Sequence, residues 1–186
     1  MTLTTPNHKA TVAMDTEAIR RALARMAHEV CERNPGMMEL VLIGVLRRGA
    51  VLAHRIAAIL PSLGVAAPPV GTLDISSYRD DGKGRPGDPR ILGRDIPFTL
   101  DGKPVLLVDD VLYTGRTVRA ALSALTDLGR PTAVQLLVLI DRGERELPIR
   151  ADYVGRNLSA PPGQRVYVKL SEIDGVDSVV ISERKA

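Results

Sequence analysis

Hydrophobic and polar residues follow two periods along the chain, and together they predict strands that alternate with helices. Residues 105–108 form an unbroken apolar run, typical of a strand buried on both faces. Residues 39–43, 70–75 and 133–140 are mostly apolar and predict three further strands. Apolar residues at helical spacing predict three helices: one after Asp15, which is a favourable helix N-cap, one at about 51–59 and one at about 120–128. Shorter apolar segments around 153–154, 166–168 and 179–181 predict further strands.

This order of elements predicts an α/β fold with a central parallel sheet flanked by helices. We expect the β-rich C-terminal portion, about 151–186, to form a small cap, or hood, with the chain's ends above the ligand edge of the sheet. The whole chain, 1–186, is long enough for one domain with a full core. The stretch from about 78 to 95 is rich in glycine and charge without periodicity, which predicts a flexible lid loop or an inert one.

The segment from residue 105 to residue 117 carries the clearest chemical signal. Its apolar run ends in two adjacent carboxylates, Asp109 and Asp110, and open α/β sheets bind ligands at the C-terminal ends of their strands. Residues 114–117, Thr-Gly-Arg-Thr, then open a helix, so their hydroxyls and free backbone N–H groups suit a phosphate. The adjacent acids suit the vicinal hydroxyls of a ribose. The segment therefore predicts binding of a phosphorylated ribose.

A second strand–loop–helix unit carries two arginines, Arg47 and Arg48, between Gly44 and Gly49. A pyrophosphate needs close backbone approach and positive charge, and this loop supplies both. Taken alone, the same pattern also fits a turn with two solvated arginines.

Basic side chains also line one side of the first predicted helix. Arg21, Arg25 and His28 fall at positions i, i+4 and i+7, and we call them the basic stripe. Periodicity alone favours a solvated helix face for such a stripe. An interaction surface for an anionic partner is the alternative.

Composition narrows the classes of function. The net charge of +3 fits anionic ligands and permits RNA binding without proving it. Aromatic residues make up 3% of the chain, which disfavours a nucleic-acid surface built from stacked rings. Cys31 is the single cysteine, so no intrachain disulfide is expected. Neither a signal-peptide pattern nor a membrane-length apolar stretch is present, so we expect a cytoplasmic protein without membrane contact.

The segment 105–117 resembles the signature of type I phosphoribosyltransferases, which bind 5-phosphoribosyl 1-pyrophosphate (PRPP). Over nearly the whole chain, flanking segments resemble the pyrimidine operon regulator (PyrR) family of bacterial proteins, which bind RNA and act as uracil phosphoribosyltransferases. These segments are Ile-Arg-Arg-Ala-Leu at 19–23, Ala-His-Glu at 27–29, Ser-Tyr-Arg-Asp-Asp at 77–81, Leu-Gly-Arg-Pro at 128–131, and Asp-Arg-Gly at 141–143 with its continuation through 145–155. The resemblance implies the type I phosphoribosyltransferase fold with a β-rich hood.

The resemblance also implies a reaction and a regulatory role. As a glycosyltransferase, the protein would convert uracil and PRPP to UMP and pyrophosphate, with Mg²⁺ carried by PRPP rather than held by protein side chains alone. As a regulator, it would bind the leader mRNA of pyrimidine-biosynthesis genes under the control of UMP and promote transcription attenuation or termination. A homodimer or a higher homo-oligomer is implied as well.

The implied roles fall on particular residues of this chain. Asp109 and Asp110 are the expected catalytic pair. The 5-phosphate of PRPP is assigned to Val111, Tyr113, Thr114, Gly115, Arg116 and Thr117, the pyrophosphate to Arg47, Arg48, Gly49 and Arg79, and the base to Asp141, Arg142, Tyr153 and Val154. RNA contacts are assigned to Arg21, Arg25, His28, Arg145 and Arg150. For Tyr153, a plain core position stays an open alternative.

Four features depart from the family pattern: Arg156 stands where the family has lysine, residues 159–163 replace a Pro-Thr-Ser stretch, and two further positions bear on the implied roles. Arg47 stands where the family usually has threonine, and Glu144 stands where it has histidine. A long cation in the pyrophosphate loop could change the catalytic rate, and a carboxylate beside the proposed RNA surface repels phosphate. Two alternatives therefore stay open: an RNA-binding regulator with little or no catalytic activity, and a phosphoribosyltransferase for another base without RNA binding.

Overall fold

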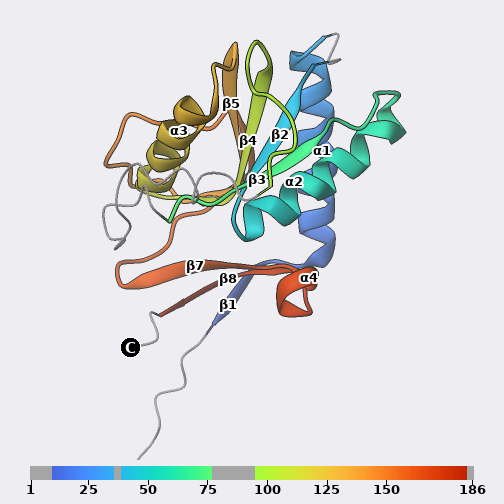
Figure 1. Ribbon diagram of the computed structural model, residues 1–186. Helices are drawn as coiled ribbons and strands as arrows, with labels where there is room; N and C mark the ends of the chain where they lie inside the picture. Colours follow the sequence, from blue (N-terminus) through green and yellow to red (C-terminus); the bar gives the residue numbers. More distant parts are fainter. Residues whose placement is uncertain (1–9, 36–38, 77–94, 184–186) are drawn as a thin grey trace, which may run out of the picture.

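The computed structural model describes residues 10–35, 39–76 and 95–183, and a five-stranded parallel sheet forms its centre (Figure 1). The strands lie in the order β3-β2-β4-β5-β6. Their bounds are Val41–Val45 for β2, Val70–Leu73 for β3, Pro104–Leu112 for β4, Ala133–Asp141 for β5 and Tyr153–Asn157 for β6. The middle strand β4 pairs in parallel with β2 and with β5. The segment with the two carboxylates is therefore a central strand, as the apolar run predicted.

Helices cover both faces of this sheet. Helices α1 (Thr16–Arg33) and α2 (Arg48–Ile59), with the short 3₁₀ helix η1 (Leu60–Leu63), lie on one face, and α3 (Arg116–Leu128) lies on the other (Figure 1). Successive residues of β4 alternate between them: Leu106 and Val108 pack in the apolar cluster of α1 and α2, whereas Val105 and Leu107 pack with α3. An unbroken apolar run is what a strand buried on both faces requires.

The helix starts follow from local chemistry. The Asp15 side chain caps α1, accepting a hydrogen bond from the Ala18 N–H at 2.8 Å, as predicted. Helix α2 begins at Arg48, three residues before the apolar spacing made it visible. Arg48 and Gly49 consequently belong to the first helical turn rather than to a loop.

A second, smaller sheet lies beyond the end of the main one. It is antiparallel, in the order β1-β8-β7, with β1 at Thr11–Met14, β7 at Gln164–Lys169 and β8 at Ser178–Glu183. The short helix α4 (Ser171–Asp174) joins β7 to β8, and we call these four elements the hood. The two ends of the described chain meet there, as expected (Figure 1). Strand β6, which we expected in the hood, instead pairs in parallel with β5 as the edge of the main sheet.

Buried apolar side chains attach the hood to the core. Met14, Val168, Leu170 and Val179 are buried in the same apolar cluster as the inner faces of α1 and α2. In the described ranges, no helix is both long and apolar enough to cross a membrane. The predicted lid and its Arg79 lie outside the described residues, apart from Asp95, whose carbonyl accepts a hydrogen bond from the Thr72 N–H at 2.8 Å.

Candidate active site

Two adjacent carboxylates occupy the last part of β4. Asp109 is 6% exposed and is the only charged side chain that is buried within the described ranges. Its Oδ1 accepts a hydrogen bond from the Asp110 N–H at 2.9 Å, and the Asp110 Oδ1 accepts one from the Val111 N–H at 3.0 Å. Burial raises the pKa of Asp110, against the opposing effects of Asp109 and of the Arg48 charge. A carboxylate held in this way favours a ligand that carries positive charge or hydroxyl donors.

A cavity of about 490 Å³ lies beside these acids. Its walls come from three strand ends that the parallel order brings together: β2 with Val45, Leu46 and Arg47, β3 with Asp74, Ile75 and Ser76, and β4 with Asp109, Asp110 and Val111. Thr117, at the start of α3, completes the lining. The cavity thus joins the loop predicted for pyrophosphate to the turn predicted for the 5-phosphate.

A second cavity, of about 550 Å³, lies between Asp110 and the hood. Asp110 and Arg48 line it on the core side. On the hood side it is lined by Ala10, the β7 residues Val166, Tyr167, Val168 and Lys169, Asp174 of α4, and Val180 and Ser182 of β8. Asp110 lines both cavities. A ligand centred on Asp110 could therefore extend into either one.

The turn at residues 114–117 has the geometry expected of a phosphate site. Gly115 precedes α3 with a φ of 94°, and Arg116 is the first residue of the helix, whose first N–H groups have no intrahelical partner. The Thr114 carbonyl accepts hydrogen bonds from the backbone N–H groups of Glu146 and Leu147, at 3.0 and 3.2 Å. Arg116 forms an exposed ion pair with Glu146 at 2.7 Å. The Arg116 N–H itself donates to the Thr114 Oγ1 at 3.5 Å, so these contacts hold the turn in shape at the start of α3.

The pyrophosphate loop approaches β4 very closely. The Leu46–Arg47 peptide bond is cis, Arg47 is exposed, and Arg48 begins α2. A Cβ atom added to Gly49 would lie 2.4 Å from the Val108 carbonyl oxygen. Only glycine therefore lets α2 start this close to the acids.

The structure does not bring two of the residues assigned to the base to these cavities. Tyr153 is fully buried, its hydroxyl donates to Gln135 at 3.1 Å, and its ring lies 5.2 Å under the Arg33 guanidinium. It begins β6, four residues before the strand's end at the ligand edge, so it is the core residue of the open alternative. The Val154 carbonyl accepts a hydrogen bond from Arg25 at 3.0 Å and is likewise engaged elsewhere.

The other two residues assigned to the base lie at the end of β5, with Asp141 as its last residue and Arg142 as the first residue of the connection after it. The Asp141 Oδ1 accepts from the Gly143 N–H at 2.9 Å, and its Oδ2 accepts from Arg145 at 2.6 Å. The Arg142 guanidinium stacks 3.9 Å from the centre of the Tyr113 ring and donates to the Gln164 carbonyl at 3.2 Å. This connection therefore ties the phosphate turn to the first residue of β7.

Arg145 differs from its sequence assignment as an RNA ligand. Its guanidinium donates to the backbone carbonyls of Leu112, Tyr113, Gly143 and Ile149 as well as to Asp141. These contacts engage all three guanidinium nitrogens inside the protein. The structure makes Arg145 the internal brace of the phosphate turn, whereas Arg150 is exposed.

The basic stripe lies on the outer side of α1, and it is exposed at all three positions. Arg25 pairs with Glu29 at 2.5 Å and donates to the Val154 and Gly155 carbonyls, so it also covers the free edge of β6. Arg21, Arg25 and Arg156 together line a shallow hollow of about 290 Å³. Arg156, which sequence analysis did not assign to the RNA surface, thus joins the stripe.

Sequence reasoning also missed the hood side of the second cavity. Lys169 and Asp174 line it, and so does Tyr167, which is 36% exposed. Apolar alternation at 166–168 predicted a strand there, yet nothing local showed that this strand faces Asp110. That information depends on how the hood docks on the core.

The sequence of the chain is similar to a known protein family. Residues 14–164 match the family model described as a phosphoribosyl transferase domain. The chain is 56% identical over 168 residues to the bifunctional protein PyrR of Chloroflexus aurantiacus, covering 90% of this chain and 92% of that protein. It is 50% identical over 181 residues to the bifunctional protein PyrR of Bacillus velezensis, covering 96% of this chain and 99% of that protein.

Solved structures show the same fold at lower sequence identity. A hypoxanthine phosphoribosyltransferase of Trypanosoma cruzi aligns with a TM-score of 0.71 and 21% identity, covering 94% of this chain and 97% of that one. One from Staphylococcus aureus aligns with a TM-score of 0.67 and 21% identity, covering 94% and 91%. At this identity the likeness concerns the fold.

Proposed function

This chain belongs to the phosphoribosyltransferase family and, within it, to the bifunctional PyrR proteins, and from this premise we propose how its site acts. The protein forms UMP and pyrophosphate from uracil and PRPP, and it regulates pyrimidine-biosynthesis genes by attenuation through their leader mRNA. The observation that carries the assignment of the site is the position of Asp110, which lines both cavities. The bond that breaks and the bond that forms share one ribose carbon, so the reacting ribose belongs where the cavities meet.

In this arrangement each part of PRPP has a place. The pyrophosphate lies in the 490 Å³ cavity beside Arg47 and the start of α2, and the 5-phosphate lies on the turn at residues 114–117. The carboxylates of Asp109 and Asp110 accept hydrogen bonds from the ribose hydroxyls. These contacts fix the ribose between its leaving group and the incoming base, which is how orientation lowers the barrier.

The acids also stabilise charge. As the bond from C1 to pyrophosphate breaks, positive charge develops on the ribose, and a buried carboxylate next to it favours the transition state over the ground state. Because burial raises the pKa of Asp110, the acidic limb of the pH–rate profile lies above 3.8, the ordinary value for aspartate. No covalent intermediate with the protein is needed.

Magnesium fits this site as a companion of PRPP. Asp74, Asp109 and Asp110 line the same cavity, and Mg²⁺ prefers one or two carboxylates plus substrate phosphates and water. Bound there, it would neutralise charge on the leaving pyrophosphate. Within the described ranges, no three acidic, histidine or cysteine side chains cluster closely enough to hold a metal by themselves.

The uracil ring belongs in the 550 Å³ cavity under the hood. Tyr167 and Val168 offer apolar contact there, and Lys169 and Asp174 offer hydrogen-bonding groups for the ring's carbonyl and N–H edge. Asp141 and Arg142 remain proposed for this edge as well, because Arg142 reaches the first residue of β7. This assignment replaces Tyr153 and Val154.

The test of the enzymatic half is a competition among bases. With saturating PRPP and Mg²⁺, we expect uracil to be converted to UMP at an ordinary enzymatic rate of roughly 1–1,000 per second. Hypoxanthine, guanine and orotate offered together with uracil should be used far more slowly. Preference for one of these bases would contradict the assignment of uracil, and no turnover with any base would leave a regulator that only senses nucleotides.

The basic stripe, joined by Arg156 and Arg150, is the proposed RNA surface. Its guanidinium groups match the repeating charge of a phosphate backbone, which dominates affinity for nucleic acids. In a homodimer or a higher homo-oligomer, two such stripes would face one RNA hairpin. Arg145 is left out of this surface because its donors are used inside the protein.

Replacing Arg21 with alanine is expected to weaken binding of a pyrimidine-operon leader hairpin without changing UMP formation. Arg21 suits the test better than Arg25, whose loss would also uncover the β6 carbonyls. One lost phosphate contact should flatten the slope of log affinity against log salt by about one unit. Filter binding across a salt series measures it.

Arg119→Ala is the matched control, because Arg119 is exposed on α3, across the sheet from the stripe. Its slope should equal that of the wild type. An equal slope for Arg21→Ala as well would move the RNA surface away from α1.

A further inference from the structure

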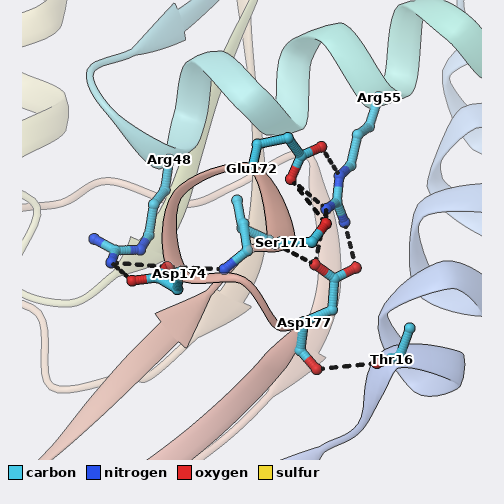
Figure 2. Close-up of polar contacts among 8 residues, drawn as sticks. Thr16, Arg48, Arg55, Ser171, Glu172, Asp174 and Asp177 are labelled. Carbon is cyan, nitrogen blue, oxygen red and sulfur yellow. Dashed lines mark hydrogen bonds and ion pairs between the residues drawn. The ribbon is translucent and has the colours of Figure 1, made fainter.

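The short helix α4 of the hood is held mainly by polar contacts. None of its four residues is buried, and its N-cap, Leu170, has no side-chain oxygen to cap it. Isolated helices of this length are not stable in water. Its position over the second cavity therefore depends on the side chains that grip it, and these come from α2 (Figure 2).

Arg55 makes the larger set of these contacts. Its Nε and Nη2 donate to both carboxylate oxygens of Glu172, at 2.9 and 2.6 Å. Its Nη1 and Nη2 donate to both oxygens of Asp177, at 2.7 and 2.8 Å, and Nη2 also reaches the Ser171 Oγ at 2.9 Å. Figure 2 shows one guanidinium held between the carboxylate of Glu172, in α4, and that of Asp177, in the chain after it. Two bidentate pairs give both geometric specificity and strength.

The same carboxylates also organise the hood's backbone. The Asp177 Oδ1 accepts a hydrogen bond from the Ser171 N–H at 2.7 Å, and the Asp177 carbonyl accepts one from the Thr16 hydroxyl at 3.2 Å. Arg55 lowers the pKa of both Glu172 and Asp177, so both are ionised at neutral pH. The contact therefore ties α4, the chain after it and the start of α1 to one point on α2.

Arg48 makes the second contact between α2 and α4. It lies seven residues before Arg55, about two helical turns along the same face, and its Nη2 donates to both oxygens of Asp174 at 2.8 and 3.0 Å. Arg48 is also a proposed pyrophosphate ligand. Arg48 lines the 550 Å³ cavity together with Asp174, and a pyrophosphate that binds Arg48 would compete with Asp174 for its guanidinium. Arg55 lines neither cavity, so it would keep its partners.

We propose that Arg55 is a positioning residue of the active site: it anchors α4 so that the hood still closes the base cavity when Arg48 turns to pyrophosphate. The proposal rests on the function proposed above. This role is distinct from a general role in folding, because the hood is also attached to the core by buried apolar side chains. These are Met14, Val168, Leu170 and Val179. Loss of Arg55 should loosen α4 without detaching the hood.

Arg55→Met is the first test, because methionine keeps much of the side-chain length and removes every donor. We expect KM for uracil to rise roughly 10- to 100-fold, as when a residue that orients a binding group is lost. The turnover number at saturating uracil should change by less than about threefold, since the missing interaction concerns binding of the base. Far-ultraviolet circular dichroism should match that of the wild type.

Hydrogen exchange gives a readout that does not need turnover. In the wild type, the Ser171 amide should stay protected when pyrophosphate is added, because its partner Asp177 is held by Arg55. In Arg55→Met this amide should exchange roughly tenfold faster and faster still with pyrophosphate. Arg55→Lys should fall between the two, because an ammonium cannot hold two carboxylates bidentately.

Arg20→Met is the matched control, since Arg20 forms an exposed ion pair with Glu17 on α1. It should leave KM and exchange unchanged. Should Arg55→Met fail to fold, Glu172→Gln weakens the same anchor with less disturbance and should raise KM and exchange in the same direction. Unchanged KM and unchanged Ser171 exchange would overturn the proposal. A wild type without uracil turnover would instead contradict the proposed function, and exchange would still decide the role of Arg55.

Discussion

Replacing Asp110 with asparagine is expected to lower the turnover number for UMP formation by roughly 100- to 1,000-fold, the usual cost of losing one electrostatic contact to the transition state. The substitution keeps the shape of the side chain and its ability to accept the Val111 N–H. It removes the negative charge from the residue that lines both cavities. Single-turnover kinetics with saturating PRPP and uracil measure the chemical step directly.

The fold should survive this substitution. Burial raises the pKa of Asp110 in the folded state, so the folded protein binds this proton more tightly than the unfolded chain does. The stability that the protonated form contributes is present at low pH and is lost as pH rises through the raised pKa. At neutral pH the ionised acid therefore costs stability, and Asp110→Asn should unfold at the same temperature as the wild type or a higher one.

Asp127→Asn provides the matched control, because Asp127 is exposed on α3 and lines neither cavity. It should keep wild-type turnover. Near-normal turnover of Asp110→Asn would contradict the proposed catalytic role of Asp110. A loss of turnover accompanied by unfolding would leave that role unsupported.

The core of the site could be predicted from sequence because its signals are local. An apolar run, two acids and a Thr-Gly-Arg-Thr turn occur within 13 residues, and each part reports its own environment. The run needs two covered faces, and the structure divides it between α1 and α2 on one side and α3 on the other. The parallel order then places the acids beside the ends of β2 and β3 without further assumption.

The assignments that the structure changed depend on contacts between distant parts of the chain. Arg25 looked like one member of a solvated stripe, yet it donates to carbonyls of β6 about 130 residues later. Arg145 lies in a highly charged segment that looks like a protein surface, but its guanidinium points inward and donates to the Tyr113 carbonyl. Tyr153 could not be placed until β6 was known to join the main sheet rather than the hood. Periodicity shows on which face of an element a basic or aromatic residue lies. Its contact partners depend on how distant elements pack together.

The hood shows the same limit at a larger scale. Strands β7 and β8 were visible as short apolar segments, and the meeting of the chain's ends was expected. The pairing of Arg55 with Glu172 and Asp177 was not, because charged residues 117 and 122 positions apart carry no mutual signal in a single sequence. The sequence predicted α2 and the hood strands separately, but not the contacts between them.

Gly49→Ala is expected to damage both stability and activity. The added Cβ would lie 2.4 Å from the Val108 carbonyl oxygen and 3.1 Å from the Asp109 Cα, and both atoms belong to the central strand, which is paired on both sides. The start of α2 must therefore move away from β4. Overpacking of this kind costs roughly 1–3 kcal/mol, which lowers the midpoint of thermal unfolding by about 2–12 °C for a chain of this length.

The shift should cost activity beyond what the lost stability explains. Arg47 and Arg48 move with Gly49, and a displacement of about 1 Å in a positioning group can cost roughly 100-fold in rate. Gly102→Ala separates the two effects: Gly102 has a φ of 72° with no atom within 4 Å of an added Cβ, so alanine there costs about 1–2 kcal/mol through the backbone alone. Differential scanning calorimetry and PRPP titration of both variants should show lower stability in each and weaker PRPP binding in Gly49→Ala alone. Wild-type PRPP affinity in Gly49→Ala would mean that the pyrophosphate does not depend on this close approach of α2 to the acids.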